Sequence, residues 1–162
     1  MNSLKLVQDE ITSTLRLVDQ DRLVELTDAF ADRTRRWLVS GQGRYRPVAS
    51  MAVMRLMHVG FDVHLTGQVT ATSIGQGDCL LMLSVSGESP VSLHLARRAA
   101  DRGARVLAIT TREDSSLAAI ADVVVAVPVQ GSRQFGKSLF EQDSHAYKTM
   151  SRRHINLELQ QQ

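Results

Sequence analysis

The sequence predicts an α/β fold, a three-layer α/β/α sandwich in which helices cover both faces of a five-stranded parallel sheet. Short apolar runs alternate with segments of helical periodicity, which is typical of parallel strands joined by right-handed crossovers. The central run, 79–84, is nearly all apolar, as expected of a strand covered on both faces. Hydrophobic residues make up 43% of the chain and aromatic residues only 4%, so we expect an aliphatic core.

The elements are expected in a regular order. Apolar residues at three- and four-residue spacing predict two N-terminal helices over residues 1–30, and Asp19 or Asp21 would cap the break between them. Elsewhere we expect strands at 37–39, 61–65, 79–84, 105–110 and 122–129, and helices at 47–58, 90–102 and 115–121. Residues 144–162 form a polar tail, either an exposed helix or a frayed end. At 162 residues we expect one domain, 1–162.

Composition excludes several classes of function. With 19 basic and 17 acidic residues the net charge is +2, which argues against general nucleic-acid binding. One cysteine, Cys79, rules out an intrachain disulfide and a multi-cysteine zinc site, and we interpret it as a small core side chain. No apolar run approaches the length of a membrane span, and the N-terminus lacks a signal-peptide core. We therefore expect a cytoplasmic protein that binds neither membrane nor metal.

The run 81–89, Leu-Met-Leu-Ser-Val-Ser-Gly-Glu-Ser, carries the main functional signal. A strand passes directly into small hydroxyl residues, a glycine and then a helix. This order places Ser84, Ser86, Gly87 and Ser89 at a helix N-terminus, where free backbone amides and the helix dipole both favour an anion. An ordinary turn between strand and helix is the alternative. The hydroxyl content favours a phosphate site.

A second loop follows the first strand and contains Ser40, Gly41, Gly43 and Arg44. It lacks the third glycine of a dinucleotide fingerprint and the Gly-Lys-Ser/Thr ending of a nucleotide loop, so alone it is equally compatible with a plain turn. Both loops are expected over one crevice at the carboxyl edge of the sheet. Arg44 and Arg46 lie in an acid-free stretch, and a guanidinium suits a phosphate or a sugar hydroxyl. The arginines at 33, 35 and 36 are interpreted as solvated.

Several short motifs of the sequence resemble those of the 6-phospho-3-hexuloisomerases, single-domain members of the sugar isomerase (SIS) superfamily. The resemblance covers about 20–143 and rests on Gly-Arg at 43–44, Val-Ala at 48–49, Met-Arg-Leu-Met-His-Val-Gly at 54–60, the serine run 84–89 and Ser-Leu-Phe-Glu at 138–141. It implies a flavodoxin-like strand order and a homo-oligomer, a dimer or tetramer. It also implies interconversion of 3-hexulose 6-phosphate and fructose 6-phosphate through an enediolate, in the ribulose monophosphate route, with no cofactor.

The resemblance also implies roles for individual residues. Ser84, Ser86 and Ser89 would hold the phosphate. Glu141 matches a glutamate that is a candidate base, and His58 matches a histidine that is a candidate for ring opening or proton relay, including across a subunit interface. From spacing alone, Glu141 would be read as a solvated residue and His58 as a packed one.

The chain departs from the family pattern in two places. The family continues Gly-Arg-Ser-Gly where this chain has Gly43-Arg44-Tyr45-Arg46. The segment 143–154 is polar where the family has an apolar helix. Two alternatives therefore remain: a sugar-phosphate-binding SIS module without turnover, and an isomerase for another sugar phosphate.

Overall fold

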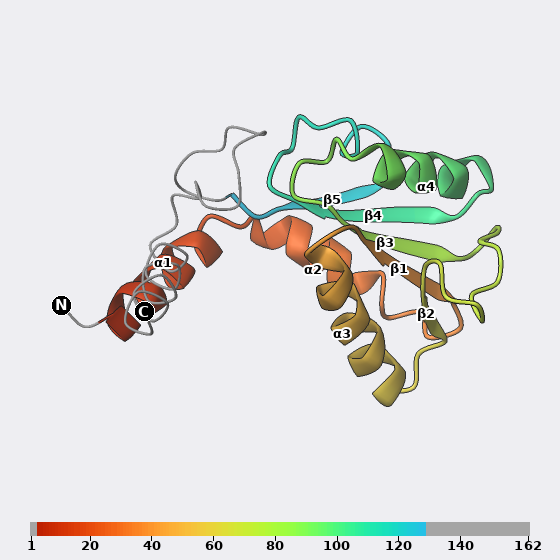
Figure 1. Cartoon of the computed structure of the whole chain (residues 1–162), viewed down its shortest axis with the longest axis horizontal. Helices are drawn as coiled ribbons and strands as arrows, with labels where there is room; N and C mark the ends of the chain where they lie inside the picture. The colour runs from red at the N-terminus through yellow and green to blue at the C-terminus, as the bar shows by residue number, and fades with distance from the viewer. Residues whose placement is uncertain (1–2, 129–162) are drawn as a thin grey trace, which may run out of the picture. The chain divides into compact units, whose positions relative to one another are not determined.

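The computed structural model describes residues 3–128. Residues 19–127 form one compact unit, shown in Figure 1 with its helices and strands labelled. Its elements are α2 (Gln20–Asp28), β1 (Trp37–Gly41), α3 (Tyr45–His58), β2 (Val63–Leu65), β3 (Cys79–Leu83), α4 (Pro90–Asp101), β4 (Arg105–Thr110) and β5 (Val123–Ala126). Helix α1 (Ser3–Leu15) belongs to a second unit and is described by itself. The assignment of 1–162 to one domain stays a prediction.

The five strands are all parallel and lie in the order β2-β1-β3-β4-β5. This confirms the predicted fold class and the flavodoxin-like order. From β1 the chain crosses to β2 at one edge, whereas from β3 it crosses to β4 on the other side. The carboxyl ends of β1 and β3 therefore flank the topological switch point, where open α/β sheets bind their ligands.

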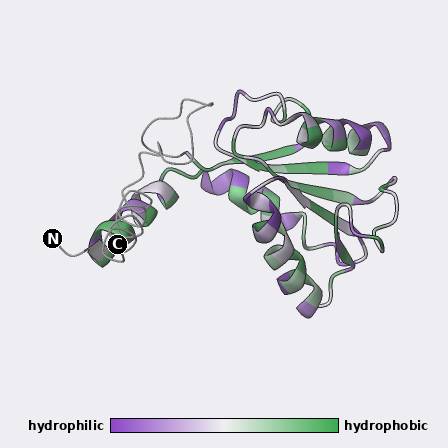
Figure 2. Cartoon of the chain, in the orientation of Figure 1, coloured by the Kyte–Doolittle hydropathy of each residue, from purple (hydrophilic) through white to green (hydrophobic). Residues whose placement is uncertain are grey.

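The helices bury both faces of the sheet. Helix α3 contacts β1 and β2, α2 contacts β5, and α4 contacts β3 and β4 from the opposite side (Figure 1). All five residues of β3 are buried, as the apolar run predicted. Figure 2 shows the strands predominantly hydrophobic and the hydrophilic residues concentrated on helices and connections. Alternation along β1 sends Leu38 into the core under α4, while Trp37 stacks on Phe30 on the other side.

Helix boundaries follow the local chemistry. Asp19 is the N-cap of α2, and its carboxylate accepts hydrogen bonds from the amides of Asp21 at 2.9 Å and Arg22 at 3.1 Å, which confirms the predicted cap. Helix α3 begins at Tyr45 rather than Pro47, so the proline lies inside the first turn, where it needs no hydrogen-bond donor.

The predicted helix at 115–121 is wrong, because this segment forms turns. The amide of Ser116 donates to the Glu88 carboxylate at 2.8 Å, and the amide of Leu117 donates to the Gly87 carbonyl at 3.0 Å. Leu117 is fully buried under α4. The segment is therefore shaped by its bonds to the loop after β3. Strand β2 is also shorter than predicted, beginning at Val63, and β5 ends at Ala126.

The interpretation of Arg36 as a solvated residue is also wrong. Its guanidinium forms a two-pronged ion pair with the buried carboxylate of Asp78 and donates to the Ser73 carbonyl at 2.8 Å and to the Thr72 hydroxyl. The Asp78 carboxylate raises the pKa of Arg36 further. Arg36 thereby holds the connection 66–78 between β2 and β3, which contains no helix. Arg33 lies 4.4 Å from the Phe61 ring centroid, another contact that solvation did not predict.

Candidate functional site

Two loops meet at the switch point of the sheet. Gly41 at the end of β1 is in register with Leu83 at the end of β3, so the residues that follow each strand start side by side. We call 84–89 the serine loop and 40–46 the glycine loop. The predicted placement of both at one carboxyl edge is thus confirmed.

Hydrogen bonds from the end of β4 and from residues that follow it hold the serine loop in place. The Val85 carbonyl accepts hydrogen bonds from the Thr111 amide at 3.1 Å, the Thr111 hydroxyl at 2.8 Å and the Thr110 hydroxyl at 3.1 Å. The Gly87 carbonyl accepts from the Leu117 amide. These bonds occupy the carbonyls of Val85 and Gly87. The Ser84 amide is also used, because it donates to the Ile109 carbonyl at 3.0 Å.

Gly87 is required for this path. Its φ is +65°, in the left-handed region, where a side chain is strained. A Cβ at this position would lie 2.2 Å from the Ser115 hydroxyl oxygen and 2.4 Å from the Ser115 Cβ. Because Ser115 is itself buried, the neighbour has no free space to move into. The loop can approach the β4–β5 connection this closely only with glycine.

Glu88 adds a charged tether that the sequence did not reveal. Its carboxylate accepts from the Ser116 amide at 2.8 Å, and this hydrogen bond holds the pKa of Glu88 below its usual value. The Glu88 amide donates to the Ser86 hydroxyl at 3.1 Å. Both bonds fix the bend of the loop. The signal for Glu88 lay in its position between a glycine and an N-cap serine, but its partner is distant in the sequence.

The serine loop carries donors that the described part of the protein does not use. Among residues 3–128, the amides of Ser86, Gly87 and Ser89 donate to no acceptor of the protein. Ser89 is the N-cap of α4, yet its hydroxyl makes no capping bond, and Pro90 occupies the first turn. The first-turn amides of α4 therefore also lack side-chain caps. Unused amides, the Ser89 hydroxyl and the positive end of a 12-residue helix are all groups that favour an anion.

The glycine loop is built differently. Gly43 has φ +55°, and the amides of Tyr45 and Arg46 close two turns onto the carbonyls of Gln42 and Gly43, each at 3.1 Å. A Cβ on Gly41 would lie 2.5 Å from the Tyr45 carbonyl oxygen, so glycine permits the close approach of α3. Arg44 is the exposed N-cap residue of α3.

Thr66, directly after β2, links the glycine loop to the neighbouring strand. Its hydroxyl is hydrogen-bonded to that of Ser40 at 2.8 Å, and both side chains are buried. Its carbonyl accepts from Arg46 at 3.2 Å. Two predicted substrate contacts are therefore already engaged within the protein, and sequence reasoning missed the residue that engages them. Tyr45 is half-buried, and its hydroxyl has no hydrogen-bond partner among the described residues.

The two predicted catalytic residues are not brought to these loops within the described chain. His58 is the last residue of α3, whereas the glycine loop ends in the first turn of that helix, so the helix separates His58 from Tyr45 by about 20 Å at 1.5 Å per residue. His58 is exposed. Glu141 lies outside the described residues. Both assignments stay predictions.

A protein-family model for the SIS domain matches residues 31–135, which includes both loops and all five strands. This chain belongs to the SIS domain family. Residues 31–135 are more than half of the chain, and the match begins just before β1.

Similar proteins agree with this SIS assignment. A 3-hexulose-6-phosphate isomerase of Mycobacterium gastri is 41% identical over 149 residues, covering 87% of this chain and 74% of the relative. One of Bacillus subtilis is 27% identical over 144 residues, covering 89% and 73%. A crystal structure of a Methanococcus jannaschii protein, reported as inferring that same function, has a TM-score of 0.71 at 25% identity and covers 82% of this chain and 76% of that one.

Three further findings concern metal ligands, membrane-spanning helices and the single cysteine of the described SIS chain. Within residues 3–128, no three His, Cys, Asp or Glu side chains gather as ligands for a metal ion. None of the helices described there has the length and apolar content needed to cross a bilayer. Cys79 is buried, as predicted, and burial raises the pKa of its thiol, which keeps it protonated and unreactive at neutral pH.

Proposed function

We propose that this protein is a phosphosugar isomerase that interconverts 3-hexulose 6-phosphate and fructose 6-phosphate. One observation carries the proposal: the serine loop offers a set of unused amides and hydroxyls at the start of α4. The high identity to a relative named for this reaction supports the choice of sugar. The ribulose monophosphate route is part of the same proposal, as is a cytoplasmic location.

The chemistry requires a proton to move between adjacent carbons. A base removes the C3 proton of fructose 6-phosphate, the electron pair forms an enediolate across C2 and C3, and protonation at C2 yields the 3-hexulose. Glu141 is proposed as that base, and His58 as the group that assists ring opening or relays a proton. The serine loop holds the phosphate, so that binding energy remote from the reacting carbons positions them.

We further propose that the protein works as a homo-oligomer, a dimer or tetramer. The exposed side of α3 carries several large hydrophobic residues, where a surface helix is expected to be mainly polar. The exposed hydrophobic residues of α3 and its C-cap are Val48, Met51, Met54, Met57 and Val59. A second copy of this chain on that face would cover them. It would also carry His58, at the end of the same helix, toward a site other than its own.

Proton exchange tests the proposed reaction. The protein is incubated with fructose 6-phosphate in deuterium oxide, and loss of the C3 proton signal is followed by NMR. We expect exchange in the natural protein, its loss in Glu141→Gln with sugar-phosphate binding retained, and normal exchange in the matched control Glu113→Gln. Undiminished exchange in Glu141→Gln would refute the choice of base.

The second candidate is a SIS module that binds sugar phosphate without turnover. It is favoured by the glycine loop, where the bulky Tyr45 replaces the serine of the family pattern and Arg46 is engaged with Thr66. Saturable binding of fructose 6-phosphate with no proton exchange in the natural protein would decide for this candidate.

A further inference from the structure

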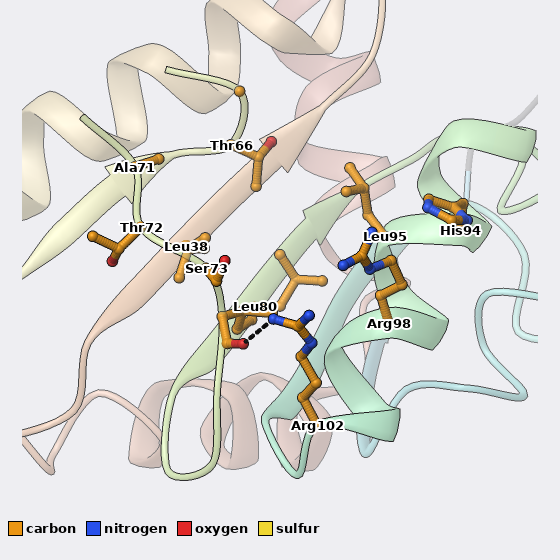
Figure 3. Close-up of a pocket in the computed structure, with 12 residues that line it drawn as sticks. Leu38, Thr66, Ala71, Thr72, Ser73, Leu80, His94, Leu95, Arg98 and Arg102 are labelled. Carbon is orange, nitrogen blue, oxygen red and sulfur yellow. Dashed lines mark hydrogen bonds between the residues drawn. The ribbon is translucent and has the colours of Figure 1, made fainter. Parts of the chain in front are cut away.

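A hollow of about 200 Å³ lies on the α4 side of the sheet (Figure 3). A crossover between parallel strands usually contains a helix, but the connection 66–78 between β2 and β3 does not. Helix α4 covers β3 and β4, so the part of the sheet around Leu38 is bordered only by α4 and this connection. The hollow occupies the space that a crossover helix would fill. We call it the α4 pocket.

The lining of the α4 pocket is apolar below and polar at the mouth. Leu38 and Leu80 of the sheet form its floor with Leu95 of α4. The hydroxyls of Thr72 and Ser73 lie on the side of the connection. This combination suits a small molecule with a compact carbon body and one polar end.

The charged groups of the lining are two arginines, Arg98 of α4 and Arg102 at its C-cap, with His94 of α4 beside them. No acidic residue lines the pocket. Arg102 donates to the Ile74 carbonyl at 3.3 Å and so is engaged. Arg98 has no hydrogen bond or ion pair with any described residue, and Figure 3 shows it extending from α4 toward the connection. His94 and Arg98 are four residues apart and thus neighbours on the helix.

The opposite wall is held in place before any ligand arrives. Arg36 bonds the Thr72 hydroxyl and the Ser73 carbonyl, and is itself fixed by Asp78. The Asp78 carboxylate also accepts from the Gly75 amide at 2.7 Å. A pre-formed wall lowers the entropic cost of binding. Fixing this wall is therefore a role for the hydrogen bonds of Arg36 to the connection.

The α4 pocket is separate from the candidate sugar-phosphate site. Of the residues predicted for substrate binding or catalysis, the ten that the structure describes do not line it. Thr66 connects the two sites, because it lines the pocket and is hydrogen-bonded to Ser40 and Arg46.

We propose that the α4 pocket binds a small organic carboxylate, with its head group on Arg98 beside His94 and its carbon body on the leucine floor. A planar carboxylate matches a single guanidinium fork. The volume exceeds the roughly 150 Å³ of a cavity that holds benzene and is below the roughly 300 Å³ where drug-sized pockets begin. The ligand is therefore about the size of a monocyclic or short-chain acid.

Benzoate is the probe for this site, with benzamide as its neutral counterpart. The full chain is titrated with each at constant ionic strength, and backbone amide shifts are followed by ¹H–¹⁵N NMR. We expect saturable benzoate shifts at 71–74 and 94–98, and at least about tenfold weaker binding of benzamide. Arg98→Gln should weaken the affinity for benzoate by a similar factor. Arg97→Gln, which changes the adjacent exposed arginine outside the lining, should alter it less than about twofold.

Three results would overturn the proposal: equal affinity for benzoate and benzamide, equal effects of the two arginine variants, or benzoate shifts confined to 84–89. The last would mean that the anion uses only the serine loop. If Arg98→Gln fails to fold, the comparison of benzoate with benzamide on the natural protein decides.

Discussion

The serine loop and the glycine loop lie at neighbouring strand ends but are fixed in opposite ways. Beyond Ser84, whose amide donates to the Ile109 carbonyl, the contacts of the serine loop to the rest of the described chain use the carbonyls of Val85 and Gly87 and the Glu88 carboxylate, so the amides of Ser86, Gly87 and Ser89 stay available. In the glycine loop the amides of Tyr45 and Arg46 close its own turns, and Ser40 and Arg46 are engaged by Thr66. The first loop therefore has donors available for the proposed anion, whereas most of the polar groups of the second are already engaged within the protein.

From this difference we expect one loop to supply most of the binding energy for the phosphate and the other to shape the space around the sugar. The donors that recognise a phosphate are expected on the serine loop, where backbone geometry sets them. Selection among sugars is expected on the glycine loop, where Tyr45 stands in place of a small residue. Variants in the two loops should therefore affect different measured quantities.

The largest effect is expected for Gly87→Ala. The new methyl would collide with Ser115 and the backbone would be strained at φ +65°, so the loop must move. We expect about 3 kcal/mol loss in the free energy of unfolding and a roughly 100-fold weaker affinity for fructose 6-phosphate, equal to ~2.7 kcal/mol. Urea unfolding and calorimetric titration measure the two quantities.

Gly77→Ala is the matched control for this variant. Gly77 also has a positive φ, +84°, but a Cβ there would meet nothing within 4 Å. It should lose about 1 kcal/mol of stability from strain alone and keep its affinity. Equal losses of affinity in the two variants would contradict the role given to Gly87.

Ser86→Ala should have the next largest effect. It removes a hydroxyl from the proposed phosphate site and the acceptor of the Glu88 amide bond. We expect about tenfold weaker binding of fructose 6-phosphate and less than about twofold change for unphosphorylated fructose. Ser50→Ala, in α3, serves as control. A loss shared equally by both sugars would remove the phosphate from the serine loop.

Glu88→Gln tests the tether through its pH dependence. Because the folded-state pKa of Glu88 is lowered, the tether stabilises the fold above the usual glutamate pKa and is lost as pH falls through the lowered value. We expect the Ser116 amide shift to titrate below about 4.3, the usual glutamate pKa, in the natural protein and not in the variant. Affinity for fructose 6-phosphate should fall by only about threefold. Persistence of the titration in Glu88→Gln would assign it to another group.

Tyr45→Phe should have the smallest effect. The Tyr45 hydroxyl has no partner among the described residues, so its removal leaves the loop unchanged. We expect less than about twofold change in affinity for fructose 6-phosphate. A tenfold loss by calorimetric titration would show that the hydroxyl contacts the ligand and that the glycine loop also contributes binding energy.

The positions of the five strands and of both loops could be predicted from the sequence because they depend on local patterns. The apolar run of β3 and the serines after it are adjacent in the chain, and parallel topology brings β1 and β3 together at their carboxyl ends. The tethers could not be predicted, since Glu88 and Ser116, or Ser40 and Thr66, meet only in the folded state. The false helix at 115–121 has the same cause, because its amides bond to the serine loop.

A titration with fructose 6-phosphate, followed by ¹H–¹⁵N NMR, addresses the central claim most directly. If the anion rests on the unused donors at the start of α4, the amides of Ser86, Gly87 and Ser89 will show the largest saturable shifts, and fructose will leave them in place. The account would be contradicted if fructose 6-phosphate bound saturably without shifting those three amide signals, or if unphosphorylated fructose shifted them equally.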